Sequence, residues 1–251
     1  MDSAPLLSLH FNPAPDLAEA ARECEAEVFL RAYGNTREQL RDEYGPYEDA
    51  SVFIALSEPG GDVVGSCRLI MPSPAGLKTL HDIARPPWSV DANRSARAAR
   101  LDLSRTWDFA TLGYRRGLKG AGRLAGAALF HGLIQSVRAN EVAAAVMIID
   151  ERVRKLLAVA GMFGRTLPGT APAGYLGSAS STPVYEHCAQ AFDRQRIANP
   201  DAYRLFVLGN GLDGISVPDL DQFRYRSPVV VTAGDRTSAS ATRGGGLATA
   251  V

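Results

Sequence analysis

An uninterrupted apolar run occupies residues 142–149, inside the segment EVAAAVMIID. A strand that lacks alternating polar positions is buried on both faces, which is typical of strands inside an α/β sheet. The chain has 251 residues, of which 46% are hydrophobic, so it can bury one sizeable core. We therefore expect an α/β fold, with a mixed central sheet and helices on its faces.

Hydrophobic periodicity and turn residues predict the remaining elements. β-branched runs at 51–56 and 62–71, separated by SEPGG, indicate an antiparallel hairpin. The predicted helices are 15–33, a short capped helix at 36–44, one within 113–140, 151–161 and one near 182–197. The further predicted strands are 100–111, 141–150, 162–168 and 203–209, with loops at 84–96 and between 168 and 181.

Composition indicates the domain organisation and excludes some kinds of partner. We expect one domain over residues 1–228 and a disordered tail over 229–251, because that tail is rich in Gly, Ser, Thr and Ala. Basic and acidic residues number 27 each, so no net field recruits nucleic acid. The three cysteines and four scattered histidines lack metal-ligand spacing, so we predict no metal. The absence of a long apolar run or a basic leader predicts a cytoplasmic protein without a membrane span.

A basic, glycine-rich turn joins the strand at 100–111 to the following helix. Backbone N–H groups and a helix N-terminus in such a turn can hold phosphates, although a solvated loop is the alternative interpretation. The turn lacks the G-K-[ST] ending of a P-loop. The predicted cofactor-binding residues are Arg115, Arg116, Lys119, Gly120, Gly122 and Arg123.

Four segments carry a resemblance to a known group of enzymes. RLAGAA at 123–128 matches the R-x-x-G-x-A pattern of the GNAT acyltransferase superfamily. The hairpin containing Gly65 and Arg68 resembles the V-G-x-x-R-L segment of acyl-homoserine lactone synthases and N-acyl amino acid synthases, and LDLSRTWDFA resembles their E-L-S-R-F segment. VFLRAYG and VRKLLAVAGMFGR also resemble segments of these enzymes, so the resemblance extends over roughly residues 20 to 185.

The resemblance implies a single GNAT-like domain and acyl transfer from a thioester to an amine. A splayed central strand would then supply a backbone N–H to the thioester carbonyl and open a groove for pantetheine. Asp102 stands where the family has glutamate and would act as the base, provided that burial raises its pKa. Arg105 would fix Asp102 once a bulge in this strand brings the two side chains together, because they point to opposite faces of a regular strand.

The remaining candidate residues would bind substrate. Arg68 and Arg105 each suit binding an acceptor carboxylate or fixing Asp102, because a guanidinium donates two parallel hydrogen bonds. Ser104 belongs to the LDLSRTWDFA segment that carries the resemblance. Trp107 is predicted to lie either in the core or in the wall of the acyl pocket. Glu43 could orient the acceptor. A structural ion pair is the alternative interpretation of Asp102 and Arg105.

We therefore predict an N-acyltransferase that moves an acyl group, expected to be fatty, to the amine of an amino acid or related metabolite. The acyl donor would be a coenzyme A thioester or an acyl carrier protein, and the sequence leaves both open. No S-adenosylmethionine pocket is identifiable, so a lactone product is not predicted. Two alternatives remain, an acetyl coenzyme A-dependent acetyltransferase and a non-catalytic sensor of acyl thioesters.

Overall fold

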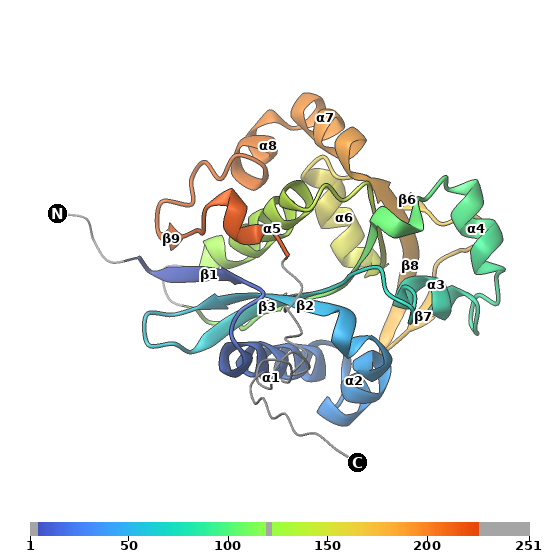
Figure 1. Cartoon of the computed structure of the whole chain (residues 1–251), viewed down its shortest axis with the longest axis horizontal. Helices are drawn as coiled ribbons and strands as arrows, with labels where there is room; N and C mark the ends of the chain where they lie inside the picture. The colour runs from blue at the N-terminus through green and yellow to red at the C-terminus, as the bar shows by residue number, and fades with distance from the viewer. Residues whose placement is uncertain (1–4, 119–121, 226–251) are drawn as a thin grey trace, which may run out of the picture.

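A nine-stranded mixed sheet runs through the computed structural model, which describes residues 5–118 and 122–225 (Figure 1). The strand order is β6-β8-β5-β4-β3-β2-β1-β9, and β7 pairs with β8. The pairs β4–β5 and β1–β9 are parallel, and the others are antiparallel. The bounds are β1 Leu7–Phe11, β2 Ser51–Ser57, β3 Val63–Ile70, β4 Thr106–Tyr114, β5 Ala144–Asp150, β6 Arg165–Thr166, β7 Ala173–Tyr175, β8 Ser178–His187 and β9 Ile215–Ser216.

Helices cover both faces of this sheet. In Figure 1, α1 and α2 lie below the sheet, α5 to α8 lie above it, and α3 and α4 lie beside the β7–β8 end. The helix bounds are α1 Pro15–Tyr33, α2 Arg37–Tyr44, α3 Lys78–Ile83, α4 Ala92–Ala98, α5 Gly122–Ala139, α6 Glu151–Val159, α7 Cys188–Ala198 and α8 Pro200–Phe206. Three short 3-10 helices are η1 Gly45–Ala50, η2 Leu103–Arg105 and η3 Leu220–Phe223. The predicted α/β class with a mixed sheet is confirmed.

Local sequence signals begin and end several elements. Thr36 and Gln39 form a reciprocal capping box at the start of α2. Gly34 adopts φ 78° at the end of α1, which favours glycine. Asp150 accepts a hydrogen bond from the Arg152 amide and begins α6. The predicted hairpin is β2–β3, with Phe53 opposite Arg68.

The strand predicted at 100–111 starts six residues later than expected. Arg100 adopts φ 56°, a left-handed conformation that a β-strand cannot contain. Asp102 then accepts a hydrogen bond from the amide of Ser104 and caps η2. Extended backbone therefore begins at Thr106, and the residues before it form a turn.

Other predicted elements change type for local reasons. Residues 203–209 begin inside α8 instead of forming a strand, because Asn199 caps that helix and Pro200 occupies its first turn. The loop predicted at 84–96 contains the start of α4, which Asp91 caps. The helix predicted near 182–197 is strand up to His187 and helix from Cys188 onward, and β7 lies within the loop predicted between 168 and 181.

The main core lies between the sheet and α5. Leu129 and Ile134 of α5 pack with Leu9, Ile54 and Leu69 of the strands, and all five side chains are buried. No helix among the described residues is long and apolar enough to cross a membrane. The predicted tail at 229–251 lies outside the described residues.

Candidate functional site

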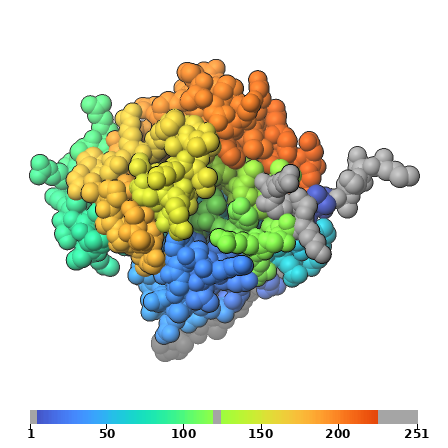
Figure 2. Space-filling view, turned by 180° about the vertical axis from the view of Figure 1, so that it is seen from behind, coloured from blue at the N-terminus to red at the C-terminus, as the bar shows by residue number. Residues whose placement is uncertain are grey.

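The central parallel strands pair over a short stretch and then part. β4 and β5 are in register at Thr106–Asp108 opposite Ala144–Val146, although β4 continues to Tyr114 and β5 to Asp150. The continuations of both strands line a cavity of about 690 Å³. Figure 2 shows the surface hollowed between the yellow residues of α6 and the green residues of β4 and α5. The separation of the two strands thus creates the site.

A β-bulge lies on β4 where the strands part. Arg68 pairs with Thr111, and Leu69 pairs with Phe109, so Ala110 is the additional residue. The amide of Arg115 donates to the carbonyl of Val64, 2.8 Å away, which fixes the side of β4 that faces β3. Because peptide groups alternate along the regular part of β4 beyond the bulge, that of Leu112 faces the gap toward β5. A backbone donor is therefore directed into the cavity.

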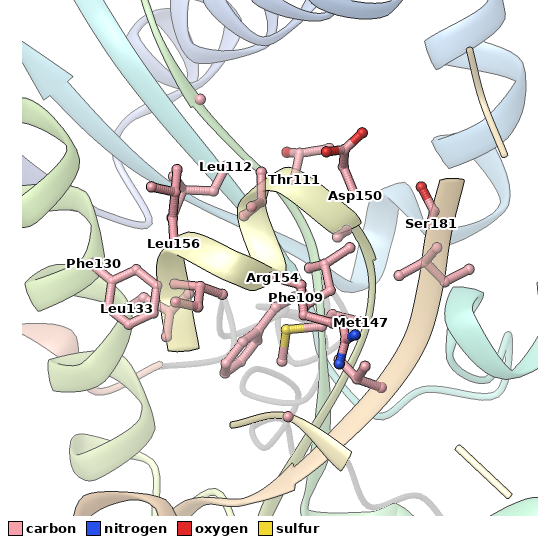
Figure 3. Close-up of a pocket in the computed structure, with 18 of the residues that line it drawn as sticks. Phe109, Thr111, Leu112, Phe130, Leu133, Met147, Asp150, Arg154, Leu156 and Ser181 are labelled. Atoms are coloured by element: carbon pink, nitrogen blue, oxygen red, sulfur yellow. The ribbon is translucent and has the colours of Figure 1, made fainter. Parts of the chain in front are cut away.

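The inner part of the cavity is apolar. Phe109 of β4, Met147 of β5 and Phe130 of α5 converge there from three elements (Figure 3). The remaining apolar side chains of this part come from α5, β8, α6 and α7 and include Leu133, Ile134, Val137, Val184, Leu157 and Phe192. Such a wall suits a hydrocarbon chain.

The opposite end of the cavity is polar. Thr111, Asp150 and Ser181 lie toward this end in Figure 3, and Tyr44 and Tyr175 also line the cavity. Burial alone would raise the pKa of Asp150, but hydrogen bonds from Arg152 and Ser178 lower it to about 2. Asp150 is therefore a fixed anion and a weak base at neutral pH.

Four arginine side chains are among the residues that line the cavity. Arg31, Arg115, Arg116 and Arg154 are among its lining residues, and the Arg115 Nε donates to Glu27 at 2.9 Å. Two of the predicted phosphate-binding residues, Arg115 and Arg116, are thus brought to the cavity. Lys119 and Gly120 lie outside the described residues, and at Gly122 and Arg123 the structure gives the helical backbone alone.

The residues predicted to be catalytic lie on an exposed turn. Asp102 accepts hydrogen bonds from the Ser104 hydroxyl at 2.6 Å and the Ser104 amide at 3.1 Å. These bonds lower the pKa of Asp102, so the expectation that burial raises it is wrong. Arg105 is exposed and donates to the carbonyl of Glu141, 2.8 Å away. The bulge lies at Ala110, so it does not bring Asp102 and Arg105 together.

Arg68 is buried among protein carboxylates. Its guanidinium donates to Glu25 at 2.7 and 3.1 Å and to Glu48 at 2.8 Å, and its side chain is 4% exposed. Thr111 donates to the same Glu25 carboxylate. Protein carboxylates therefore occupy the position in which an acceptor carboxylate was expected. Trp107 belongs to the buried core cluster rather than to the cavity wall.

Glu43 belongs to a second buried ionic cluster, which sequence reasoning did not find. Its carboxylate accepts a hydrogen bond from Lys78 at 2.8 Å, and Lys78 also donates to Asp82 at 2.7 Å and to the Tyr175 hydroxyl at 2.9 Å. Tyr175 donates to Asp82 at 2.5 Å. The i,i+4 spacing of Lys78 and Asp82 was a usable signal, whereas Tyr175 comes from a distant glycine-rich segment that no local pattern connects to α3.

Asp108 of β4 lies beside this cluster. It accepts hydrogen bonds from the Thr79 amide at 2.5 Å and the Thr79 hydroxyl at 2.9 Å. Burial raises its pKa to about 7, even though these bonds and Lys78 act in the opposite direction. Among the described residues, no group of three or more His, Cys, Asp or Glu side chains is arranged to hold a metal ion.

A mixed sheet that opens between two central parallel strands, with a bulge at the opening and a cavity inside it, defines the GNAT-like fold. The fold predicted from the sequence motifs is therefore confirmed. No family model and no curated sequence matches the chain.

Solved structures share this fold. The N-acyl amino acid synthase FeeM from uncultured soil microbes matches with a TM-score of 0.59 and 14% identity, over 78% of this chain and 98% of that one. The coenzyme A-dependent acyl-homoserine lactone synthase BjaI, solved with MTA, matches with a TM-score of 0.56 and 18% identity, over 88% and 97% of the two chains. A further BjaI structure contains SAM and isopentyl-CoA. At these identities the likeness establishes the fold.

Proposed function

We propose that the protein is an N-acyltransferase that moves a fatty acyl group from a thioester to the amine of an amino acid or related small metabolite. The apolar cavity between the separated halves of β4 and β5 carries this proposal. Its volume of about 690 Å³ falls within the range of small-molecule sites. The named activities of FeeM and BjaI support the same reaction class.

The strand beside the bulge supplies the hydrogen-bond donor that would polarise the thioester carbonyl. The backbone N–H of Leu112, just beyond the bulge, faces the gap, where it can donate to the thioester carbonyl and to the oxyanion that forms when the amine attacks. The acyl chain would then lie among Phe109, Phe130 and Met147. This arrangement leaves the polar end, with Tyr44 and Tyr175, for the amine.

The donor's phosphates or carrier would bind at the mouth. Arg31, Arg115 and Arg116 form a cationic rim there, which suits the phosphates of coenzyme A or of a phosphopantetheine arm on an acidic carrier protein. The structure supports both donors equally. BjaI, a coenzyme A-dependent enzyme, adds weight to the coenzyme A thioester.

An acetyl donor is the weaker alternative, because an acetyl group would leave most of the apolar wall without contacts. A non-catalytic sensor would bind acyl thioesters and form no amide. Turnover measured with acyl chains of different length distinguishes the three functions. The proposed enzyme turns over fastest with a long chain, an acetyltransferase with the acetyl group, and a sensor with none.

The test is amide formation from acetyl-, hexanoyl- and decanoyl-coenzyme A with the twenty protein amino acids, measured by mass spectrometry. We expect amides, formed fastest with a long chain. Ala191→Phe places a ring in the cavity from α7 and should reduce decanoyl transfer by roughly tenfold or more while acetyl transfer persists.

Ala189→Phe is the matched control, because Ala189 is exposed on the same helix and should tolerate the ring. A wild-type protein that binds decanoyl-coenzyme A and forms no amide would favour the sensor. A preference for acetyl-coenzyme A, or equal loss at every chain length in Ala191→Phe, would contradict the fatty acyl assignment.

A further inference from the structure

Tyr175 connects the cavity to a buried ionic cluster. The residue lines the cavity, and its hydroxyl donates to Asp82 and accepts from Lys78. Lys78 is 4% exposed at its side chain, Asp82 is 12% exposed, and Glu43 is 39% exposed and reaches the surface. The contacts thus form a continuous chain from the cavity wall to solvent.

This chain lies against the part of β4 that carries the bulge. Thr79, the neighbour of Lys78, donates two hydrogen bonds to Asp108, two residues before Ala110. Tyr44 also lines the cavity, and the Lys78 ammonium lies 5.2 Å from the centre of its ring. Ala110 packs against the hydrophobic cluster that contains Tyr44. The ionic cluster therefore lies beside the bulge and shares Tyr175 with the cavity wall.

The charges in this cluster favour a cation in front of it. Two carboxylates, Asp82 and Glu43, face the single ammonium of Lys78, and the carboxyl group of Asp108 lies nearby. An excess of negative charge in a buried setting stabilises positive charge that develops on a nearby nitrogen. An amine that attacks a thioester develops such a charge before it loses a proton.

We propose that Tyr175 is a catalytic residue that relays the proton of the acceptor amine to Asp82. The inference rests on the proposed acyltransferase function and specifies how the site removes the proton. The amine nitrogen forms a bond to the thioester carbon, and the Tyr175 oxygen takes one proton from that nitrogen as its own proton moves to Asp82 Oδ2. The C–S bond then breaks, and the departing thiolate recovers one proton from Asp82 through solvent, which yields an amide and a thiol.

The test compares wild type and Tyr175→Phe with decanoyl-coenzyme A and an equimolar mixture of the twenty protein amino acids. We expect kcat to fall by about 100-fold, with an unchanged KM for the thioester. The second readout is the dependence of kcat on the deuterium fraction of the solvent. It should be curved for wild type, because two protons move together, and linear for the variant. A purely structural role for Tyr175 would leave this dependence unchanged.

Two further variants complete the test. Asp82→Asn retains an oxygen that can accept the Tyr175 hydrogen bond, but this oxygen cannot take up a proton. We therefore expect its kcat to fall as far as that of Tyr175→Phe. Asp82→Asn replaces Tyr175→Phe in the test if Tyr175→Phe does not fold. Tyr47→Phe is the matched control. The Tyr47 hydroxyl forms a 2.6 Å hydrogen bond with His81, which lies on α3 with Lys78 and Asp82, and Tyr47 does not line the cavity. This control variant should retain wild-type kcat.

The outcomes separate this inference from the proposed function. If wild type forms no amide, the proposed function and the relay are both wrong. If wild type forms amide and Tyr175→Phe and Asp82→Asn retain its kcat, the relay alone is wrong. A loss confined to KM would also overturn it.

Discussion

At the scale of single residues, the two aspartates of the central segment have opposite environments. Asp102 is exposed and its pKa is lowered, chiefly by the Ser104 hydroxyl, whereas Asp108 is buried and its pKa is raised to about 7. In the folded protein Asp108 therefore holds a proton between pH 4 and 7 that the unfolded chain releases. Its contribution to stability is present at low pH and is lost as the pH rises through about 7.

Asp108→Asn tests this assignment. Because each pKa unit corresponds to about 1.36 kcal/mol, ionising Asp108 should cost the wild-type fold roughly 4 kcal/mol on going from pH 4 to pH 8. The asparagine of the variant does not ionise, so the variant avoids this cost. We therefore expect its free energy of unfolding to exceed that of wild type at pH 8, and this difference to become smaller near pH 5. Urea denaturation at both pH values measures the difference. Parallel pH profiles for the two proteins would show that Asp108 does not titrate in this range.

The sequence alone could not distinguish these two aspartates. Both belong to LDLSRTWDFA, and the E-L-S-R-F resemblance favoured Asp102. The difference arises because Arg100 adopts a left-handed conformation and Asp102 caps a turn, which delays the strand until Thr106. Arg68 was predicted to bind an acceptor carboxylate, whereas its partners are Glu25 and Glu48, which lie on elements that a local pattern does not connect to it.

At the scale of elements, the β7–β8 hairpin holds Tyr175 in place. Its turn contains Leu176 at φ 42° and Gly177 at φ 79°. A Cβ atom on Gly177 would come within 2.1 Å of the carbonyl oxygen of Tyr33, at the end of α1. Ser178 anchors the other side of the turn, because its hydroxyl donates to Asp150 at 2.7 Å. Helix α1, α3 and the start of α6 thus all fix one turn.

Gly177→Ala should displace this turn. We expect a loss of roughly 1 to 3 kcal/mol in the free energy of unfolding, because the methyl group would overlap the Tyr33 backbone at a left-handed residue. Gly174→Ala is the matched control on the same hairpin, where an added Cβ meets ordinary contacts at 3.7 Å. Chemical denaturation of both variants measures the difference. Equal stabilities would show that the hairpin can move away from α1 without cost.

Elements with strong local signals could be predicted, and those set by tertiary pairing could not. The capping box at Thr36 and the apolar run of β5 are sufficient to locate their elements. The apolar run at 203–209 favoured a strand, but the Asn199 cap and Pro200 start α8 there. β7 has three residues and exists because it pairs with β8.

At the scale of the whole molecule, the sheet consists of two parts that share a short connection. One part contains β1 to β4 with β9, and the other contains β5 to β8. The register between them covers Thr106–Asp108 and Ala144–Val146. A ligand in the cavity contacts both parts, so its binding should stabilise the folded state of the entire protein.

Decanoyl-coenzyme A should therefore raise the midpoint of thermal unfolding more than coenzyme A does. At a ligand concentration 100 times Kd the stabilisation is about 2.7 kcal/mol, or roughly 5 to 11 °C for a protein of this size. Ala191→Phe should reduce the shift for the decanoyl ligand and leave that for coenzyme A unchanged. An equal shift with both ligands in wild type would indicate that the acyl chain does not enter the cavity.

The short register between β4 and β5 also leaves the continuations of both strands with unpaired edges that border the cavity. The two strands pair as far as Asp108 and Val146, whereas their continuations to Tyr114 and Asp150 do not pair with each other and line the cavity. In the proposed complex, the acyl chain would occupy the inner end of this gap, the thioester would lie at the bulge, and the hydrated headgroup would remain at the outer end. A donor of the proposed kind would therefore run lengthwise between the two strands, and its contacts would be divided between the two parts of the sheet.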